Sequence, residues 1–193
     1  MLKVIIIQPG ATDFDEQGRI KGCLDLPLNQ TGRQQVARTI FELAEAHLDH
    51  VYSAPCQSAR ETAEALAKEH PVKITLFDPL RNLDHGLWHG KLIEEVKRQQ
   101  PRVYRMWQEG QENVCPPEGE SWAQAKERVA TGLRKILRWH REGVIALVIP
   151  EPVATLVRSL VSHCELGDLW KAECDCGRWE VLTVEPAEFA LER

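Results

Sequence analysis

The sequence predicts a three-layer α/β/α sandwich with a mostly parallel central sheet. Two short apolar runs, residues 4–7 and 144–149, are typical of strands that are buried on both faces, as in parallel sheets. Segments with apolar residues at helical spacing alternate with the strand-like runs, and this alternation is the pattern of α/β folds. A length of 193 residues suffices for one sizeable core, so we expect residues 1–193 to form a single domain.

The first part of the chain predicts a strand, a helix and a second strand. The run 4–7 is broken by a Pro-Gly pair, so the strand ends in a loop. Thr31 and Gln34 have the spacing of a capping box, which predicts a helix that starts there and ends near Asp49. Residues 51–53 form the second strand, and this order predicts parallel pairing through a right-handed crossover.

The rest of the chain continues the alternation. We expect strands at 74–77 and 179–184, and helices at 92–100, after Ser121, and at 153–162. Two more capping-box patterns occur, Ser58 with Glu61 and Ser121 with Gln124, and Ser58 is alternatively a neutral serine in the first turn of a helix. Pro152 suits the first turn of the helix at 153–162, because the N–H that proline lacks would have no helical partner there.

Composition favours an ordinary soluble protein. Hydrophobic residues make up 43% and charged residues 27% of the chain, and the net charge of −5 is spread without long blocks of one sign. We therefore expect no nucleic-acid partner. The apolar start is too short for a signal-peptide core and no run reaches bilayer length, so we expect no membrane association and a cytoplasmic location.

The cysteines are expected to be reduced thiols, because no secretory signal accompanies them. His163, Cys164, Cys174 and Cys176 carry zinc-type ligand atoms near the C-terminus. The one-residue spacer between the last two is not the usual zinc-knuckle spacing, so we expect no metal and no other cofactor.

Several blocks, in the same order along the chain, resemble the histidine phosphatase superfamily, the phosphoglycerate-mutase-like proteins. In that family the first strand runs into Arg-His-Gly, and later blocks read Ser-Ser-Pro-Leu-x-Arg-Ala, Gly-x-Trp-Glu-Gly and Pro-x-Gly-Glu-Ser. The similar blocks here are residues 4–28, 53–63, 80–90 and 116–121. Gly10, Thr12 and Arg19 match the family pattern.

The resemblance implies phosphoryl transfer to a histidine, but the residues that perform it in the family are replaced. The nucleophilic histidine position is Pro9, and the second histidine position is Pro150. The two arginine positions are Gln8 and Ser58, and the position of the acidic glutamate is Asn82. Proline has neither a side-chain heteroatom nor a backbone N–H, so phosphohistidine chemistry is excluded at position 9.

The charges near the predicted pocket also differ from those of an anion site. Glu151 and Asp15, the latter where the family has Asn, would repel an anion. Arg19 is the one matching cation, and it either braces the loop or contacts a ligand. We thus predict a degenerate pocket without catalytic residues, formed by Gln8, Pro9, Gly10, Thr12, Asp15, Arg19, Ser58, Asn82, Pro150 and Glu151.

Three hypotheses follow. The leading interpretation is a catalytically inactive pseudophosphatase that binds a small molecule or a protein. The alternative is an enzyme with altered, non-phosphohistidine hydrolase chemistry in the same pocket, with His85, His89, Asp84 or Glu151 as acid–base groups. The third is a structural subunit that forms a homodimer.

Overall fold

The computed structural model describes residues 1–111, 114–164, 166–173 and 176–185. Its centre is a sheet with strand order β3-β2-β4-β1-β5. The strands are β1 (Leu2–Ile7), β2 (His50–Ser53), β3 (Ile74–Leu76), β4 (Gly143–Val148) and β5 (Trp179–Val184). The pairs β1–β4, β4–β2 and β2–β3 are parallel, and the edge strand β5 runs antiparallel to β1, so the prediction of a mostly parallel sheet is confirmed.

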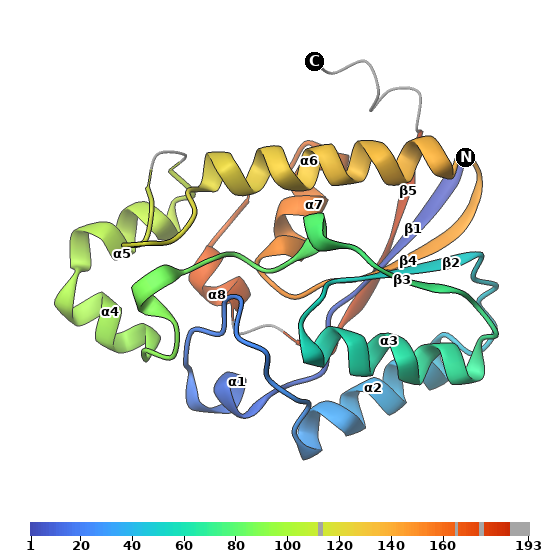
Figure 1. Cartoon of the computed structure of the whole chain (residues 1–193), viewed down its shortest axis with the longest axis horizontal. Coiled ribbons are helices and arrows are strands. Elements are labelled where there is room, and N and C mark those ends of the chain that lie inside the picture. The colour runs from blue at the N-terminus through green and yellow to red at the C-terminus, as the bar shows by residue number, and fades with distance from the viewer. Residues whose placement is uncertain (112–113, 165, 174–175, 186–193) are drawn as a thin grey trace.

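Helices cover both faces of the sheet, as predicted (Figure 1). They are α1 (Asp13–Gln17), α2 (Gln30–Glu42), α3 (Gln57–Glu69), α4 (Ile93–Gln99), α5 (Pro101–Gln108), α6 (Trp122–Trp139), α7 (Val153–Ser162) and α8 (Leu169–Glu173), with 3₁₀ turns η1 (Asp78–Leu80) and η2 (Gly86–Trp88). In Figure 1, α2 and α3 lie on one side of the sheet, while α6 and α7 lie on the other. The short elements α1, α8, η1 and η2 have no predicted counterpart.

The predicted direct pairing of the first two strands is wrong. β4 lies between β1 and β2, so Ile5 and Val51 both pair with Ala146. The most apolar strands, β1 and β4, are thus neighbours within the interior of the sheet, and each is mostly buried.

Two predicted capping boxes are also wrong. Helix α2 begins after Asn29, whose side chain accepts from the N–H of Gly32 at 2.8 Å, and it ends at Glu42. Thr31 instead donates its hydroxyl to Glu16 at 2.7 Å. Ser58 is the second residue of α3 rather than its cap, so the alternative of a first-turn serine is confirmed, and the residue lines the hollow described below.

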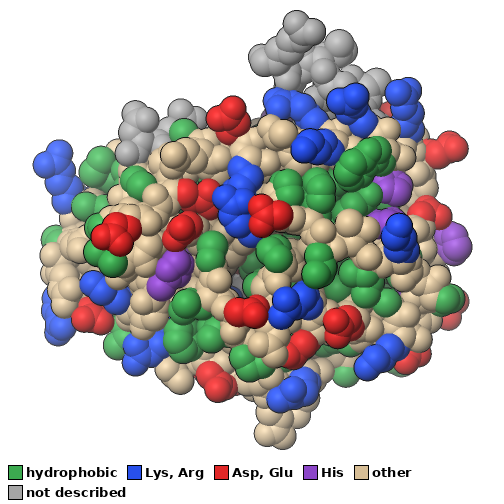
Figure 2. Space-filling view, in the orientation of Figure 1, with side chains coloured by type: hydrophobic (Ala, Val, Ile, Leu, Met, Phe, Trp, Pro, Cys, Tyr) green, Lys and Arg blue, Asp and Glu red, His purple; other side chains and the backbone are tan. Residues whose placement is uncertain are grey.

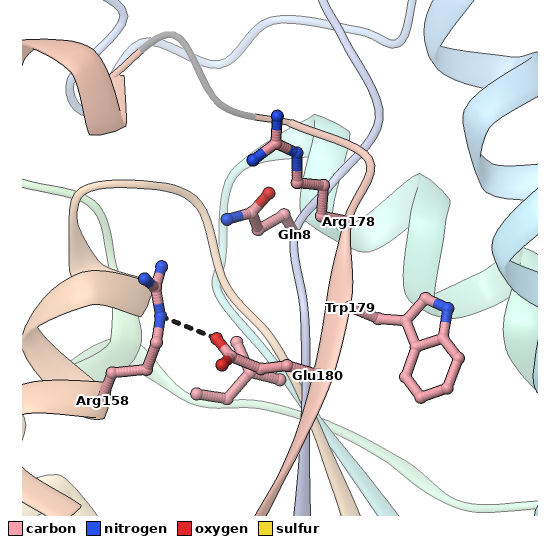
Figure 3. A pocket seen from close by; sticks show the side chains of 6 residues that line it. Gln8, Arg158, Arg178, Trp179 and Glu180 are labelled. Atoms are coloured by element: carbon pink, nitrogen blue, oxygen red, sulfur yellow. Dashed lines mark ion pairs between the residues drawn. The ribbon is translucent and has the colours of Figure 1, made fainter. Parts of the chain in front are cut away.

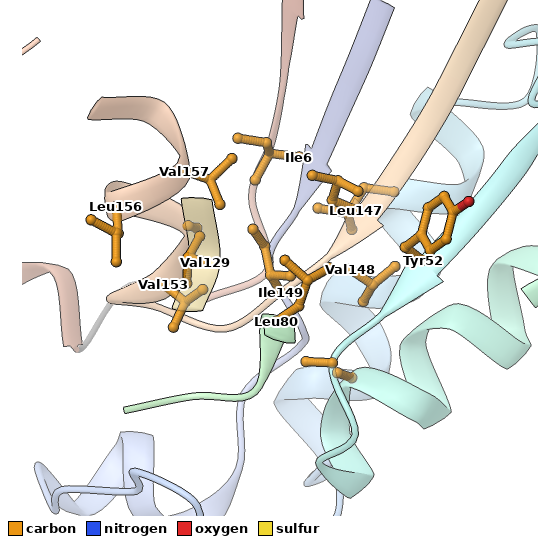
Figure 4. Packing of buried hydrophobic residues seen from close by; sticks show 14 of the residues in the cluster. Ile6, Tyr52, Leu80, Val129, Leu147, Val148, Ile149, Val153, Leu156 and Val157 are labelled. Atoms are coloured by element: carbon orange, nitrogen blue, oxygen red, sulfur yellow. The ribbon is translucent and has the colours of Figure 1, made fainter. Parts of the chain in front are cut away.

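The third capping box is confirmed. Ser121 accepts from the N–H of Gln124 at 3.3 Å, and the Gln124 side chain accepts from the N–H of Ser121 at 2.8 Å. The helix α7 has its predicted bounds, although Pro152 is the residue before it, not a member of its first turn. Figure 4 shows how apolar residues of α6 and α7, including Val129, Val153 and Val157, pack against the strand residues Ile6 and Leu147.

Within the described residues, we find no helix that combines the length and the apolar character that a bilayer crossing requires. Figure 2 shows Lys, Arg, Asp and Glu side chains interspersed over one face of the molecule. The net charge is therefore not concentrated in a single-sign patch on this face.

Two glycines allow the loop after β1 to lie against α2. A Cβ on Gly32 would stand 2.1 Å from the backbone oxygen of Ala11, and a Cβ on Gly10 would stand 2.3 Å from the backbone oxygen of Gly32. The loop and α2 are also joined by a hydrogen bond of 2.8 Å, in which the Ala11 N–H donates to the Gln35 side chain. The backbone approach fixes the direction in which the loop leaves the sheet.

Gly32→Ala is expected to lower the free energy of unfolding by about 1–3 kcal/mol, the usual cost of overpacking. Helix propensity alone predicts the opposite sign, a gain of up to about 1 kcal/mol for alanine over glycine. Urea unfolding decides between them, with Gln34→Ala on the exposed face of α2 as the control. A stabilised Gly32→Ala protein would contradict the close approach.

The rings of His50, Tyr52 and His140 form a cluster between β2 and the end of α6. The Tyr52 hydroxyl and His140 Nε2 are 2.8 Å apart, and His50 Nε2 lies 2.8 Å from the Thr75 hydroxyl. Burial lowers the pKa of His50 and of His140, and for His50 the nearby His140 and Lys73 lower it further. Both histidines are therefore favoured as neutral rings.

We expect the free energy of unfolding to decrease as the pH falls below about 6.5, the ordinary histidine pKa. Below pH 6.5 the histidines of the unfolded chain bind protons, while His50 and His140 in the folded chain remain neutral until their lower pKa values are reached. The contribution to stability that is present above pH 6.5 is therefore lost as the pH falls toward those lower values. His140→Gln should flatten this slope in urea unfolding curves measured at several pH values. His47→Gln, which changes an exposed histidine, should leave the slope as it is.

Candidate active site at the ends of β1 and β4

A polar hollow lies where β1 and β4 end, the position at which ligands usually bind in such sheets. It has about 370 Å³ of empty space, counting its open mouth. Its walls come from the loops after the two strands, the start of α3, the segment 21–26 and the loop before η2. The lining residues are Pro9, Gly10, Thr12, Lys21, Gly22, Leu24, Leu26, Cys56, Ser58, Asn82, Pro150 and Glu151.

The structure brings most of the predicted pocket residues together. Of the ten predicted positions, the hollow includes all except Gln8, Asp15 and Arg19. Gln8 points toward β5, where it lines a different cavity. Both proline replacements, Pro9 and Pro150, therefore lie where the family resemblance places the reacting histidines.

Glu151 is the buried acidic group of the hollow, with only 1% of the residue exposed. Its carboxylate accepts from Gln8 Nε2 at 2.7 Å and from the Thr155 N–H at 2.9 Å, and it forms an ion pair with Arg158. Burial raises the pKa of Glu151, while Arg158 and the hydrogen bonds from Thr155 and Gln8 lower it by less. The carboxyl group is thus a stronger base than an ordinary glutamate.

Lys21 is the cation of the hollow, and the sequence did not single it out. Its ammonium group pairs with Asp15, whose other oxygen accepts from the Thr12 N–H at 2.7 Å and from the Thr12 hydroxyl at 2.8 Å. The negative charge of Asp15 is therefore offset by a partner rather than presented to a ligand. The sequence analysis identified Arg19 as the cation instead. Which of these two side chains faces the hollow depends on the backbone conformation of the loop, and the sequence does not show it.

Arg19 braces the loop, which was one of the two predicted roles. Its Nη1 donates to the backbone oxygen of Gly90 at 2.7 Å, and its Nε donates to Gln17 at 2.8 Å. Backbone hydrogen bonds of the same region, from Ile20 to Lys91 and from Gly90 to Ile20, hold the two segments together. The guanidinium group is thus part of the support for the loop that carries Lys21.

Arg19→Gln is expected to lower the free energy of unfolding by about 1–2 kcal/mol, because the partly buried carbonyl of Gly90 loses a charge-assisted donor. Thermal or urea unfolding measures this loss. Arg33→Gln on the exposed face of α2 is the control and should change stability little. An Arg19→Gln protein as stable as the Arg33→Gln protein would remove the bracing role.

The histidines proposed as acid–base groups lie outside the lining of the hollow. His85 is fully buried, 5.2 Å from the ring centre of Trp107. His89 Nε2 accepts from the backbone N–H groups of Cys23 and His85, each at 3.2 Å, and Asp84 accepts from the N–H of Gly86. His89 thus contacts the loop around residue 22 through Cys23. Of the four proposed acid–base residues, Glu151 is the one that lines the hollow.

The C-terminal group of potential metal ligands is described only in part, because Cys174 lies outside the described residues. Cys164 is exposed, and Cys176 Sγ accepts a hydrogen bond from Gln35 Nε2 at 3.7 Å. Among the residues that the structure places, no three His, Cys, Asp or Glu side chains gather in a way that could hold a metal ion.

The fold and the hollow define an α/β protein with a site at the ends of its two central strands, and comparison with known proteins gives the family. A model of the histidine phosphatase superfamily (branch 1) matches residues 4–193. This chain belongs to the histidine phosphatase superfamily.

The relatives include proteins named as phosphatases and mutases. Phosphoserine phosphatase 1 from Hydrogenobacter thermophilus is 29% identical over 186 residues, covering 96% of this chain and 88% of that protein. Phosphoglycerate mutase-like protein 4 from Arabidopsis thaliana is 30% identical, covering 76% and 65%. A bifunctional protein from Mycobacterium tuberculosis is 30% identical over 90% of this chain, which spans only 48% of that protein.

Solved structures share the fold. The mycobacterial glucosyl-3-phosphoglycerate phosphatase has a TM-score of 0.81 at 19% identity, covering 94% of this chain and 92% of its own. The α-ribazole phosphatase from Shigella flexneri has a TM-score of 0.77 at 18% identity, covering 94% and 90%.

The interpretation of this chain as an inactive pseudophosphatase is contradicted by these relatives. Their names point to active phosphatases, and they favour the alternative of an enzyme with altered chemistry. The physical reason for the correction lies in the hollow itself. Replacing the histidines with Pro9 and Pro150 excludes one mechanism, but Glu151 and Lys21 remain among the residues that line the hollow.

Proposed function

We propose that this chain is a phosphatase that hydrolyses a small phosphate monoester without a phosphohistidine intermediate. One observation carries the proposal: a buried carboxyl group of raised pKa, Glu151, lines the hollow in which family members act. The phosphatases among the relatives support a phosphate ester as the substrate.

Glu151 is the general base of the proposed reaction. It takes a proton from a water molecule, whose oxygen attacks phosphorus as the bond from phosphorus to the leaving oxygen breaks. The proton passes from Glu151 to the leaving oxygen, so an alcohol and inorganic phosphate are released. A base whose pKa is raised toward the working pH is suited to this transfer, because it is a better proton acceptor than an ordinary glutamate.

Lys21 is the cationic residue of the proposed site, and Asp15 already offsets part of its charge. Lys21 lines the same hollow as Glu151, together with Ser58 and Asn82. The Asn82 oxygen already accepts from the N–H of Leu83 at 2.9 Å, which leaves its amide nitrogen as the donor. This set replaces two arginines with one lysine and neutral donors, so we expect weaker binding of the phosphoryl group than a two-arginine site would give.

The hollow is small, with about 370 Å³ of empty space that includes its open mouth. We infer that only the phosphoryl group enters, and that the rest of the substrate lies at the mouth against Leu24 and Leu26.

Glu151→Gln is expected to lower kcat for phosphate monoester hydrolysis by about 10²–10⁴-fold, the usual contribution of a general base. In the unchanged protein, kcat/KM should fall on the acid side at a pH above 4.5, the ordinary glutamate pKa, because the base must be ionised and burial raises its pKa. Release of inorganic phosphate from a panel of monoesters, measured between pH 4 and 9 (about the range in which the fold is expected to persist), gives both quantities.

The exposed carboxylate of Glu64 on α3 provides the matched control, since Glu64→Gln should leave kcat unchanged. Circular dichroism shows whether Glu151→Gln remains folded. Equal turnover by Glu151→Gln and the unchanged protein would remove Glu151 as the base. An acid-labile phosphate label that stays on the protein after reaction with a labelled substrate would contradict direct attack by water, and no release above background from any monoester would overturn the proposed function.

A further inference from the structure

The strand β3 forms an edge of the sheet, because it pairs with β2 and none of the described strands lies beyond it. The Phe77 N–H donates to the Ser53 oxygen at 2.9 Å, so the odd-numbered residues of this stretch turn their backbone groups toward β2. Successive residues of a strand turn these groups to opposite edges, so the N–H and C=O groups of Ile74 and Leu76 point outward. β3 therefore offers backbone donors and acceptors to another strand.

Apolar side chains lie along this edge on one face of the sheet. Thr75 lies 2.8 Å from His50 in the ring cluster at the end of α6, so the alternate residues Ile74 and Leu76 face the other side, where α3 lies. Leu76 is 52% exposed, and Ile74 is only half-buried. Both residues thus combine outward-pointing backbone groups with apolar side chains that water can reach.

The opposite face of the sheet carries exposed aromatic surface at the same edge. Trp139, at the end of α6, is 59% exposed, and the centre of its ring lies 6.0 Å from that of Phe77. Single exposed apolar residues are ordinary, whereas a group of them on both faces of an unpaired edge indicates an interaction surface.

The other edge strand, β5, differs from β3 because charged side chains accompany it. Figure 3 shows the cavity between β5 and α7, in which Arg158 of α7 and Glu180 of β5 face each other, with Arg158 Nε 2.7 Å from the Glu180 carboxylate. Arg178 lies next to the start of β5. Charged side chains on an edge strand discourage pairing with another sheet. The residues of β3 carry no charge, so β3 is the edge that is open to a second strand.

We propose that β3 pairs with β3 of a second copy of this chain, antiparallel about a two-fold axis at Thr75, so that the two sheets become one. In this register Ile74 of each copy lies opposite Leu76 of the other, and each such pair exchanges both of its backbone hydrogen bonds. The paired side chains lie on the same face of the joined sheet and cover each other's apolar surface. The edge is thus complementary to itself, which is why a second copy is the occupant.

The charged residues beside β3 also fit this register. Lys73 is exposed and would lie opposite Phe77 of the second copy, near Trp139 there, where an ammonium group over an aromatic ring is favourable. The two Lys73 residues lie at opposite ends of the pair and do not repel each other. Asp78, which pairs with Arg81 of its own copy at 2.9 Å, follows Phe77 and brings a negative charge toward Lys73.

The proposed interface is separate from the hollow, because the residues of β3 lie outside its lining. Two copies of the enzyme would pair with both hollows left open. The proposal therefore does not depend on the reaction proposed for the hollow.

Sedimentation velocity of the whole chain, at about 1 to 200 µM, tests the association. We expect a reversible dimer with a Kd of about 100 µM or below, in the weak range that is typical of small interfaces. Leu76→Lys should raise this Kd at least about 10-fold, because it places an unpaired charge opposite Ile74. Phe41→Lys makes the same change at an apolar residue of α2 that is 82% exposed, and it should associate as the unchanged protein does.

Thr75→Cys tests the register. A residue on the axis lies opposite itself, and the Cα atoms of such a pair are about 4.5 Å apart, within the range that a disulfide spans. Mild oxidation should therefore give a covalent dimer of Thr75→Cys. Leu76→Cys and the unchanged protein, whose native thiols set the background, should give little.

A chain that stays monomeric up to about 200 µM would overturn the proposal, as would a dimer that Leu76→Lys leaves intact. Cross-linking of Leu76→Cys as efficient as that of Thr75→Cys would overturn the register. If Leu76→Lys is not folded by circular dichroism, the comparison of the two cysteine variants decides. These readouts involve no turnover, so a failure here is distinguishable from a failure of the proposed hydrolysis.

Discussion

The structure around both cavities depends on one buried carboxylate. Glu151 follows β4 at the centre of the sheet, and a charge in that position must be compensated by hydrogen bonds and an ion pair. Three groups from two elements supply them: Gln8 after β1, and on α7 the Thr155 N–H in the first turn and Arg158 one turn further on. Arg158 in turn pairs with Glu180 of β5, so one charge links the ends of four elements.

The replacements at the family's reactive positions share one property, because none of them adds a positive charge near Glu151. Gln8 offers a neutral donor, which satisfies the carboxylate without adding a second cation beside Arg158. Pro9 and Pro150 line the hollow without presenting an N–H or a charged side chain. The charged residues in the lining, Glu151 and Lys21, both have ion-pair partners, whereas the histidines of the family resemblance have no counterpart there.

Apolar spacing and local capping patterns predicted the most regular strands and helices. The buried strands β1 and β4, the capped helix α6 and the bounds of α7 all follow from apolar spacing and local hydrogen bonds. The order of strands was missed because pairing between β1 and β4 is decided by contacts far apart in sequence. Thr31 was mistaken for a cap because its contact with Glu16, from another segment, outcompeted the local pattern.

The sequence predicted which positions form the site, but it did not predict the roles of the charged residues there. Seven of the ten predicted residues line one hollow, yet sequence alone gave Asp15 and Glu151 as repulsive groups and Arg19 as the cation. In the fold each of these charged groups has a partner, and the partner determines the role of the group. Asp15 positions Lys21, and Arg19 supports the loop that carries it. Glu151 acquires a raised pKa, because burial outweighs the donors around it. Residue type therefore indicated where chemistry could occur, and the contacts of each charged group determine which chemistry the hollow supports.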